Sequence, residues 1–252
     1  MPSRFGEQDA NLPRMRVVSL CPSTTETLLG LGVEPVGRTR FCIHPADRIA
    51  SVPSLGGTKD PKLERIAALE PDLIFMNAEE NRAEDHAWLA ERFEIDVSMP
   101  RSPVEVPALL RRWGKRLDRV EPAEKAARAI EARVDALSVR GSTHPFLYFI
   151  WRRPWMVAGR ETYVDALLRL GGGRNVETRS GYVEIEPSDD ELMVLLSDEP
   201  FPFKAQHQRE VQALMPSADV RLVGGDDLCW HGIRTIRGLD QVAALFSLRP
   251  AE

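Results

Sequence analysis

The chain has 252 residues, of which 43% are hydrophobic and 28% are charged, and its formal net charge is −5 with a pI of about 5.7. A chain of this length can bury one large core or two smaller ones. Its acidic balance argues against binding to nucleic acid or to an anionic membrane surface. No stretch approaches the roughly 20 apolar residues of a membrane-spanning helix, so the sequence predicts no membrane span.

The N-terminal segment and the cysteines indicate in which cellular compartment the protein is expected. Residues 1–14 are polar and lack the apolar centre of a secretory leader. The three cysteines, Cys21, Cys42 and Cys229, are too few and odd in number for a disulfide framework. Both features favour a reducing compartment, and we expect a cytoplasmic protein.

Strand and helix patterns alternate in the first third of the chain. A capping-box pattern, Ser23 to Glu26, predicts one helix start, and Asp60 followed by Pro61 predicts another. Strands are predicted at 16–20, 35–40, 72–77 and 95–99, and helices at 24–31, 61–70 and 83–93. Such alternation predicts a parallel sheet with both faces covered by helices.

The middle of the chain lacks strand patterns. Residues 107–139 combine apolar side chains at helical spacing with many strong helix formers, and Pro122 lies at or near a helix boundary. A helical element of this length spans more than about 20 Å. We therefore expect a stiff helical connector between two α/β blocks.

Alternation resumes in the last third. Strands are predicted at 146–151, 155–158, 191–197 and 220–223, and helices at 162–170, 205–215 and 233–248. The run Gly171 to Gly173 follows a helix, so it predicts a helix end and a loop and not a dinucleotide-binding turn.

Two segments resemble a known family. Arg16 to Glu26, RVVSLCPSTTE, with the following LGVEPVG, is similar to the start of class III solute-binding proteins. The segment LERIAALEPDLI, 63–74, is similar to the most recognisable stretch of that family. The family is also called the helical-backbone metal receptors and includes periplasmic cobalamin-binding proteins. The resemblance covers roughly residues 15–250.

The resemblance implies an architecture and a function. It implies two Rossmann-like lobes joined by a long helical connector, with the ligand in a cleft between them. We place the N-terminal lobe at 15–102, the connector at 103–142 and the C-terminal lobe at 143–252. The implied function is binding of a metal chelate, with a corrinoid such as cobalamin first, then a ferric siderophore or haem. The implied partners are that small molecule and an ABC transporter permease, and we expect a monomer that is not an enzyme.

The sequence departs from the family pattern in one element of the C-terminal lobe. Members have a helix before the strand that corresponds to 191–197, and Pro187 to Asp190 leave little room for one. We therefore expect the C-terminal lobe to differ there.

Residues just after the strands are the candidate ligand contacts, because ligands of parallel α/β sheets bind beyond the carboxyl ends of the strands. Aromatic side chains suit the flat, apolar faces of a corrin or a porphyrin, and polar loops suit its rim. The alternative for each aromatic is a place in the core. The predicted ligand-binding residues are Pro22, Ser23, Phe41, Asn77, Trp151, Phe201, Asp226 and Trp230.

Two Cys-x-His steps suggest a metal. Cys42 with His44, and Cys229 with His231, follow strands of different lobes. Residues two apart on an extended segment point the same way, so the four side chains could meet on zinc or a similar metal. The alternatives are that these residues pack or hydrogen-bond locally, or that one histidine (His44, His231 or His207) binds the metal of a chelate.

Other functions stay open at this point. An intracellular enzyme or chaperone that handles a metal or a metal cofactor would use the Cys-x-His steps, and a ligand sensor is a weaker alternative. The acidic pairs Glu79-Glu80 and Asp198-Glu199 follow corresponding strands, and solvated loops are the expected explanation. We expect no fixed cofactor beyond cobalamin or a metal ion bound as the ligand.

Overall fold

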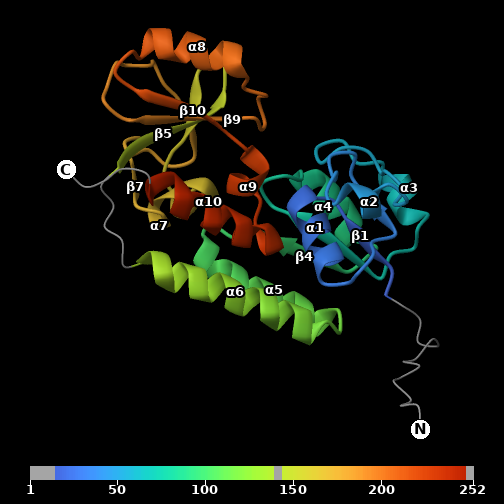
Figure 1. The fold of residues 1–252 in the computed structure, drawn as a ribbon. Coiled ribbons are helices and arrows are strands. Elements are labelled where there is room, and N and C mark those ends of the chain that lie inside the picture. Colours follow the sequence, from blue (N-terminus) through green and yellow to red (C-terminus); the bar gives the residue numbers. More distant parts are fainter. Residues whose placement is uncertain (1–14, 139–143, 248–252) are drawn as a thin grey trace.

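The computed structural model describes residues 15–138 and 144–247, and these form two α/β lobes beside a pair of helices (Figure 1). The predicted segment 1–14 and the predicted end of the last helix at Leu248 lie outside the described residues. The two-lobed α/β fold predicted from the sequence is confirmed. The lobe boundaries at 102/103 and 142/143 stay a prediction.

The N-terminal lobe is a parallel sheet with helices on both faces. Its elements are β1 (Val17–Ser19), α1 (Pro22–Gly30), β2 (Gly37–Arg38), α2 (Ala46–Ile49), α3 (Leu63–Ala67), β3 (Leu73–Asn77), α4 (Ala83–Ala90) and β4 (Ile95–Ser98). The strand order is β2-β1-β3-β4, and all pairs are parallel. The predicted parallel sheet is therefore confirmed in this lobe.

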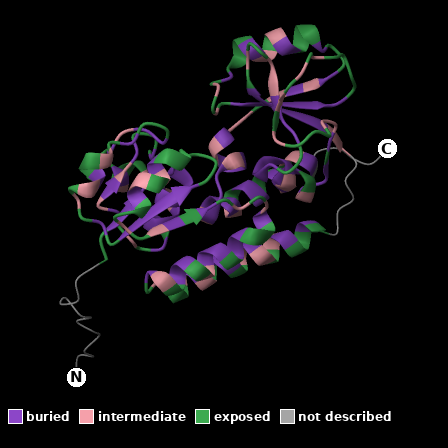
Figure 2. Ribbon diagram, turned by 180° about the vertical axis from the view of Figure 1, so that it is seen from behind, coloured by how far each residue is buried: buried purple, intermediate pink, exposed green. Residues whose placement is uncertain are grey.

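Alternate residues of β1 and β3 supply the two faces of this sheet. Val17 and Phe75 pack with Trp113 of the connector, and Val18 and Ile74 pack in a second cluster with α3 and α4. Because every β3 side chain is buried, the strand is a continuous apolar run, as parallel strands usually are. Figure 2 shows the buried strands inside each lobe and exposed residues on the outer helix surfaces.

Both predicted helix starts in this lobe are wrong. Helix α1 begins at Pro22 and α3 at Leu63, and no side chain caps either N-terminus. The Ser23 and Glu26 side chains reach the other lobe instead, and Asp60 pairs with Arg40. These side chains therefore make tertiary contacts in place of the helix-capping hydrogen bonds that the local sequence predicted.

The connector is a helical hairpin, and the helix boundary expected at or near Pro122 lies at Val120, where the second helix begins. After the short helix η1 (Pro103–Glu105), α5 (Val106–Arg116) and α6 (Val120–Ser138) pack side by side. Asp118 has φ 53° at the turn between them. Because α6 has 19 residues, it is about 28 Å long. Its Ala123 packs in the core of the first lobe and its Ile130 in that of the second, so α6 joins both cores.

The C-terminal lobe contains a mixed sheet. Its elements are β5 (His144–Trp151), β6 (Met156–Ala158), α7 (Tyr163–Leu170), β7 (Gly173–Asn175), β8 (Tyr182–Glu184), β9 (Met193–Ser197), α8 (Ala205–Leu214), β10 (Asp219–Val223), α9 (Gly225–Cys229), η2 (Gly232–Arg234) and α10 (Thr235–Ser247). The order is β10-β9-β5-β6-β8, with β7 also paired to β5. Strands β6 and β8 are antiparallel to their neighbours, and the others are parallel.

Two short strands were not predicted. Strand β7 begins at Gly173, inside the run assigned to a helix end and loop, and β8 holds only three residues. No helix lies between β8 and β9 within the described chain, which confirms the expected departure from the family pattern.

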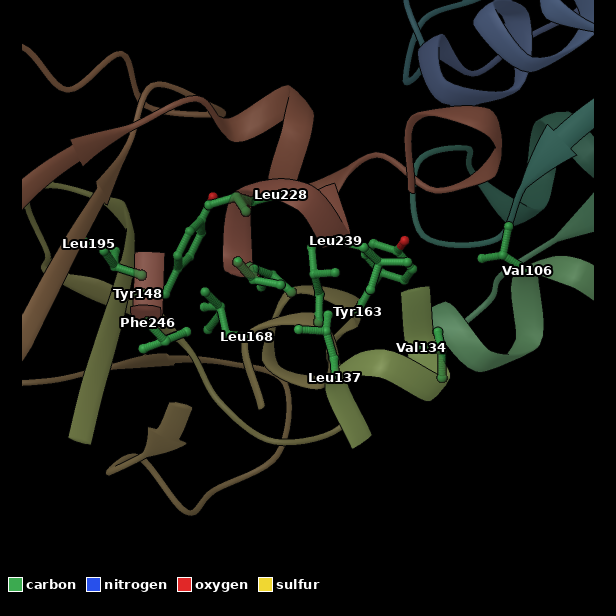
Figure 3. Packing of buried hydrophobic residues seen from close by; sticks show 14 of the residues in the cluster. Val106, Val134, Leu137, Tyr148, Tyr163, Leu168, Leu195, Leu228, Leu239 and Phe246 are labelled. Atoms are coloured by element: carbon green, nitrogen blue, oxygen red, sulfur yellow. The ribbon is translucent and has the colours of Figure 1, made fainter. Parts of the chain in front are cut away.

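The core of this lobe is continuous with the connector. Figure 3 shows Tyr148 and Leu195 of the sheet and Leu168 of α7 near Leu239 and Phe246 of α10. Val106, Val134 and Leu137 of the connector belong to the same cluster. Among the described residues, no helix is long and apolar enough to cross a membrane.

Candidate functional site

The carboxyl ends of the strands of both lobes lie near the junction between the two lobes. The segment after β10 carries α9 and η2 from the second lobe to α1 of the first (Figure 1). The side chains after β1, β3, β9 and β10 are therefore the ones that the fold brings together. We call this region the interlobe region.

His231 lies at the centre of the interlobe region. Its Nε2 is 3.1 Å from Nδ2 of Asn77 and 3.3 Å from Oγ of Ser23, both in the first lobe. Asn77 Oδ1 accepts the backbone N–H groups of Glu79 and Glu80, which fixes its amide orientation and points Nδ2 toward the imidazole. Nε2 of His231 is therefore the acceptor, and the neutral ring carries its proton on Nδ1.

The environment keeps this imidazole neutral. His231 is 6% exposed, and within the described chain its buried Nδ1 has no hydrogen-bond partner. Burial lowers its pKa from 6.5 to about 4. His231 thus acts as a neutral contact between the lobes, and Ser23 and Asn77, predicted as ligand contacts, bond to it.

A buried ionic network lies beside His231. The Arg234 guanidinium donates to Glu26 of α1 at 2.6 and 2.8 Å, to Asp226 at 2.6 Å and to Asp227 at 2.8 Å. Arg234 is only 4% exposed, so these carboxylates replace its hydration. The sequence reasoning missed Arg234 and Glu26, because they are 208 positions apart.

The same segments are in close steric contact. A side chain at Gly232, which has φ +86°, would collide with Thr27 of α1. The Thr27 hydroxyl accepts the backbone N–H of Ile233 at 3.1 Å. Together with His231 and Arg234, these contacts form what we call the interlobe joint.

A second set of contacts connects the lobes through aromatic groups. Trp230 packs edge-on against His44 at 5.7 Å between ring centroids, and its Nε1 donates to Glu199 at 2.9 Å. His44 Nε2 is 3.4 Å from Oδ2 of Asp226. The structure therefore brings together three of the predicted site residues, His44, Asp226 and Trp230, from the two lobes.

Other aromatic residues predicted as ligand contacts lie at strand ends and are partly exposed to solvent. Phe41 follows β2 and is 49% exposed, and Trp151 ends β5 and is 40% exposed. Phe201 packs edge-on against Trp151 at 5.7 Å. Exposed aromatic side chains of this size are available to a ligand. Pro22, in contrast, is buried at the first position of α1.

The described residues do not gather the four Cys and His ligands of the predicted metal site. Cys42 is fully buried inside the first lobe, where Thr25 and Thr39 hydroxyls contact its sulfur, while His44 faces the other lobe. Cys229 lies 3.3 Å from the Tyr148 hydroxyl, and burial raises the pKa of its thiol to about 12. No cluster of three or more His, Cys, Asp or Glu side chains is placed to hold a metal within residues 15–138 and 144–247.

His207 has a local role. Its Nδ1 accepts the backbone N–H of Lys204 at 3.0 Å at the start of α8, and its ring packs against Phe201 and Phe203. Two surface hollows, of about 220 and 320 Å³, lie away from the interlobe region. One is lined by residues of β5 and β9 at their amino ends, and the other by η1, α6 and α7.

Carboxylates are concentrated in the interlobe region. Glu79 and Glu80 follow β3, Asp198 and Glu199 follow β9, and Asp226 follows β10. Burial, then Asp226, Asp198 and Glu80, raise the pKa of Glu199, although the bond from Trp230 lowers it. Burial, followed by the charge of Glu79 in the other lobe, raises the pKa of Tyr182 of β8, a residue that the sequence reasoning did not single out. Glu79, Glu80 and Asp198 are exposed, as expected for solvated loops, whereas Glu199 is partly buried.

A family model of periplasmic binding proteins matches residues 17–194. The chain belongs to the periplasmic binding protein family.

Curated relatives carry a shared name. The chain is 25% identical over 174 residues to the vitamin B12-binding protein of Vibrio campbellii, a match that covers 66% of this chain and 62% of that protein. It is 26% identical over 222 residues to the vitamin B12-binding protein of Pectobacterium carotovorum, covering 83% and 71%. The chain thus matches less than two thirds of the length of the first of these relatives.

Solved structures show the same fold. The periplasmic vitamin B12 binding protein BtuF of Vibrio cholerae superposes with a TM-score of 0.79 at 20% identity, covering 92% of this chain and 96% of that one. The periplasmic haem binding protein HutB of Vibrio cholerae gives a TM-score of 0.77 at 19% identity, covering 94% and 100%.

Proposed function

We propose that the protein binds a metal chelate of the corrinoid or haem class between its two lobes, as a solute-binding protein of the ABC-transporter type. The observation that carries the proposal is the set of aromatic and polar side chains at the facing strand ends of two lobes that α6 holds together. The vitamin B12-binding relatives support the class of ligand.

The site is built from both lobes. Phe41 and Trp151 offer exposed apolar faces to a flat macrocycle, and Trp230 is held by Glu199 and His44. Ser23, Asn77 and His231 hold the lobes in register beneath it, in place of direct ligation. We therefore propose ligand contacts by Phe41, Trp151, Phe201 and Trp230, with His44 as the candidate axial ligand.

Domain motion on binding is expected to be small. The interlobe joint and α6 connect the lobes through buried groups, which favours a narrow hinge movement over a wide opening. A permease partner and a monomeric state are parts of the proposal. The free thiols of Cys21, Cys42 and Cys229 support the predicted reducing compartment.

Calorimetric titration of the full chain with cyanocobalamin, haemin and ferrioxamine B tests this proposal. We expect one site per chain for at least one chelate, with Phe41→Ala and Trp151→Ala each weakening binding about tenfold, since buried aromatic contacts dominate such sites. Val120→Ala and Leu214→Ala, which truncate exposed apolar side chains elsewhere, are matched controls. Lack of binding by all three chelates would contradict the proposal.

A further inference from the structure

The exposed ring of Phe41 is covered on one side by a guanidinium group. Phe41 follows β2 and is 49% exposed. The guanidinium carbon of Arg40 lies over this ring, 4.8 Å from its centre. A cation in this position is attracted by the negative potential of the aromatic face. The Phe41 ring therefore has a partner within the protein and keeps free surface for a second contact.

Asp60 holds the Arg40 guanidinium in place. Nη1 and Nη2 of Arg40 donate to the two carboxylate oxygens of Asp60 at 3.1 and 3.2 Å. Such a bidentate contact fixes the plane of a guanidinium group as well as its position. The orientation of the Phe41 ring thus depends on a residue that lies 20 positions further along the chain, in the loop before α3.

The loop that carries Asp60 is itself anchored. The backbone N–H of Arg40 donates to the carbonyl oxygen of Gly56 at 2.7 Å. The buried Asn81 side chain donates to the carbonyl oxygen of Thr58 at 3.0 Å. Because both sides of the loop are bonded to strand-end segments of the same lobe, the Asp60 carboxylate has a defined place beside β2.

Gly57 leaves room for this ion pair. A side chain at Gly57 would collide with Oδ1 of Asp60 and would lie 3.0 Å from Nη2 of Arg40, and its three nearest atoms all belong to these two side chains. The backbone of Gly57 is outside the left-handed region, so an alanine there is opposed by the ion pair alone. Gly57→Ala would therefore displace the pair without removing either charge.

The stack on Phe41 differs from comparable stacks elsewhere in the molecule. Within the described residues, arginine guanidinium groups also lie over Trp88, Trp155 and Trp230. Trp88 and Trp155 are partly buried and pack against hydrophobic clusters, and Trp230 is 9% exposed. Phe41 is exposed and follows the carboxyl end of a parallel strand, which is where ligands of such sheets bind.

Resting on the proposed chelate-binding function, we infer that Arg40 and Asp60 are positioning residues that hold the Phe41 ring ready to pack on a flat, apolar face of the ligand. A ring that is held in advance loses less conformational freedom on binding than a free side chain does. The Arg40 charge is compensated by Asp60, so the pair acts through the ring and not by attracting an anionic ligand.

Three substitutions separate positioning from charge in calorimetric titrations of the full chain with cyanocobalamin and with haemin. Arg40→Ala removes a positive charge, Asp60→Asn removes a negative charge, and Gly57→Ala changes no charge. We expect each of them to weaken binding by about threefold, because each releases the ring. Melting temperatures should stay the same, since the ion pair is exposed. Opposite effects of Arg40→Ala and Asp60→Asn, with none from Gly57→Ala, would overturn the inference.

A double-mutant cycle tests whether the pair acts through Phe41. In a Phe41→Ala background the same three substitutions should cause no further loss of affinity. Arg92→Ala is the matched control, because Arg92 lies over Trp88 just before β4, at the opposite end of the sheet, and it should leave affinity unchanged. Losses that add to that of Phe41→Ala would overturn the inference and leave chelate binding intact. Binding of neither chelate would overturn the proposed function, and the inference with it.

Discussion

Two groups of side chains lie in neighbouring loops at the junction between the lobes, and they differ in whether their charged groups form ion pairs. In the interlobe joint, Arg234 meets Glu26, Asp226 and Asp227, and His231 stays neutral between Ser23 and Asn77. A second group of side chains, which we call the acidic region, consists of Glu79, Glu80, Asp198 and Glu199, and these carboxylates form no ion pair within the described chain. The difference indicates that the joint stabilises the folded protein, while the acidic region does not.

Removing the central cation of the joint should have the largest effect. Arg234→Ala removes the buried cation that Glu26, Asp226 and Asp227 share and leaves Glu26 with no cationic partner in the described chain, so we expect a loss of about 3–5 kcal/mol in the free energy of unfolding. Urea denaturation followed by circular dichroism measures it. Arg237→Ala is the matched control, because Arg237 also contacts Asp227 but is exposed; its effect should be about 0–1 kcal/mol. Equal losses in both variants would refute the buried joint.

The neutral histidine of the joint should make stability depend on pH. The pKa of His231 is about 4 in the folded protein and 6.5 without burial. The unfolded chain therefore takes up its proton first, and stability falls as the pH drops from 6.5 towards 4. The shift corresponds to about 3 kcal/mol in total.

A variant isolates this contribution. His231→Gln keeps a hydrogen-bonding group but cannot titrate, so its loss of stability between pH 6.5 and 4 should be smaller than that of the wild type by about that amount. Thermal or urea unfolding across this pH range provides the comparison. Parallel pH profiles for the two proteins would mean that His231 is protonated in the fold.

The close approach of η2 to α1 gives a third comparison. Gly232 and Gly181 both have positive φ, +86° and +79°, but a side chain at Gly232 would meet Thr27, whereas Gly181 has open space. We expect Gly181→Ala to cost about 1 kcal/mol, for the backbone alone, and Gly232→Ala about 2–3 kcal/mol. If chemical denaturation gives the two variants the same cost, the two lobes do not touch here as described.

Removing a charge from the acidic region should raise the stability of the protein, whereas the substitutions above lower it. Burial and Glu79 raise the pKa of Glu80, so its charged form is disfavoured in the folded protein, and this cost is present at neutral pH and vanishes below the ordinary glutamate pKa. Glu80→Gln should therefore stabilise the unliganded protein at pH 7, by at most about 0.5 kcal/mol because solvent screens this side chain, and should have no effect at pH 4. A loss of stability at pH 7 in melting experiments would contradict the account.

Local sequence patterns predicted most of the fold. The buried run of β3 and the alternation of strands with helices produced the parallel sheet of the first lobe, because a continuous apolar segment must be covered on both faces. The short strands β7 and β8 carry no such pattern, since three residues paired at a sheet margin bury little. The turn at Asp118 lies close to Pro122, where the sequence predicted a helix boundary.

The candidate site was harder to predict. Strand-exit reasoning found His44, Asp226, Trp230 and His231, because the ends of parallel strands converge. It assigned Cys42 and His44 a common direction, whereas one is buried and the other faces the second lobe. The pairing of Arg234 with Glu26 depends on how two lobes dock, and no local pattern reports that contact.

Hydrogen–deuterium exchange of the full chain with and without saturating cyanocobalamin tests the central claim, that loops of both lobes hold one ligand between them. The account predicts slower exchange in the segments 77–81 and 40–44 of the first lobe and 197–201 and 224–231 of the second, with little change in α8 or the hairpin turn near Asp118. Slower exchange in one lobe alone, or only at the hollow near β5 and β9, would contradict it.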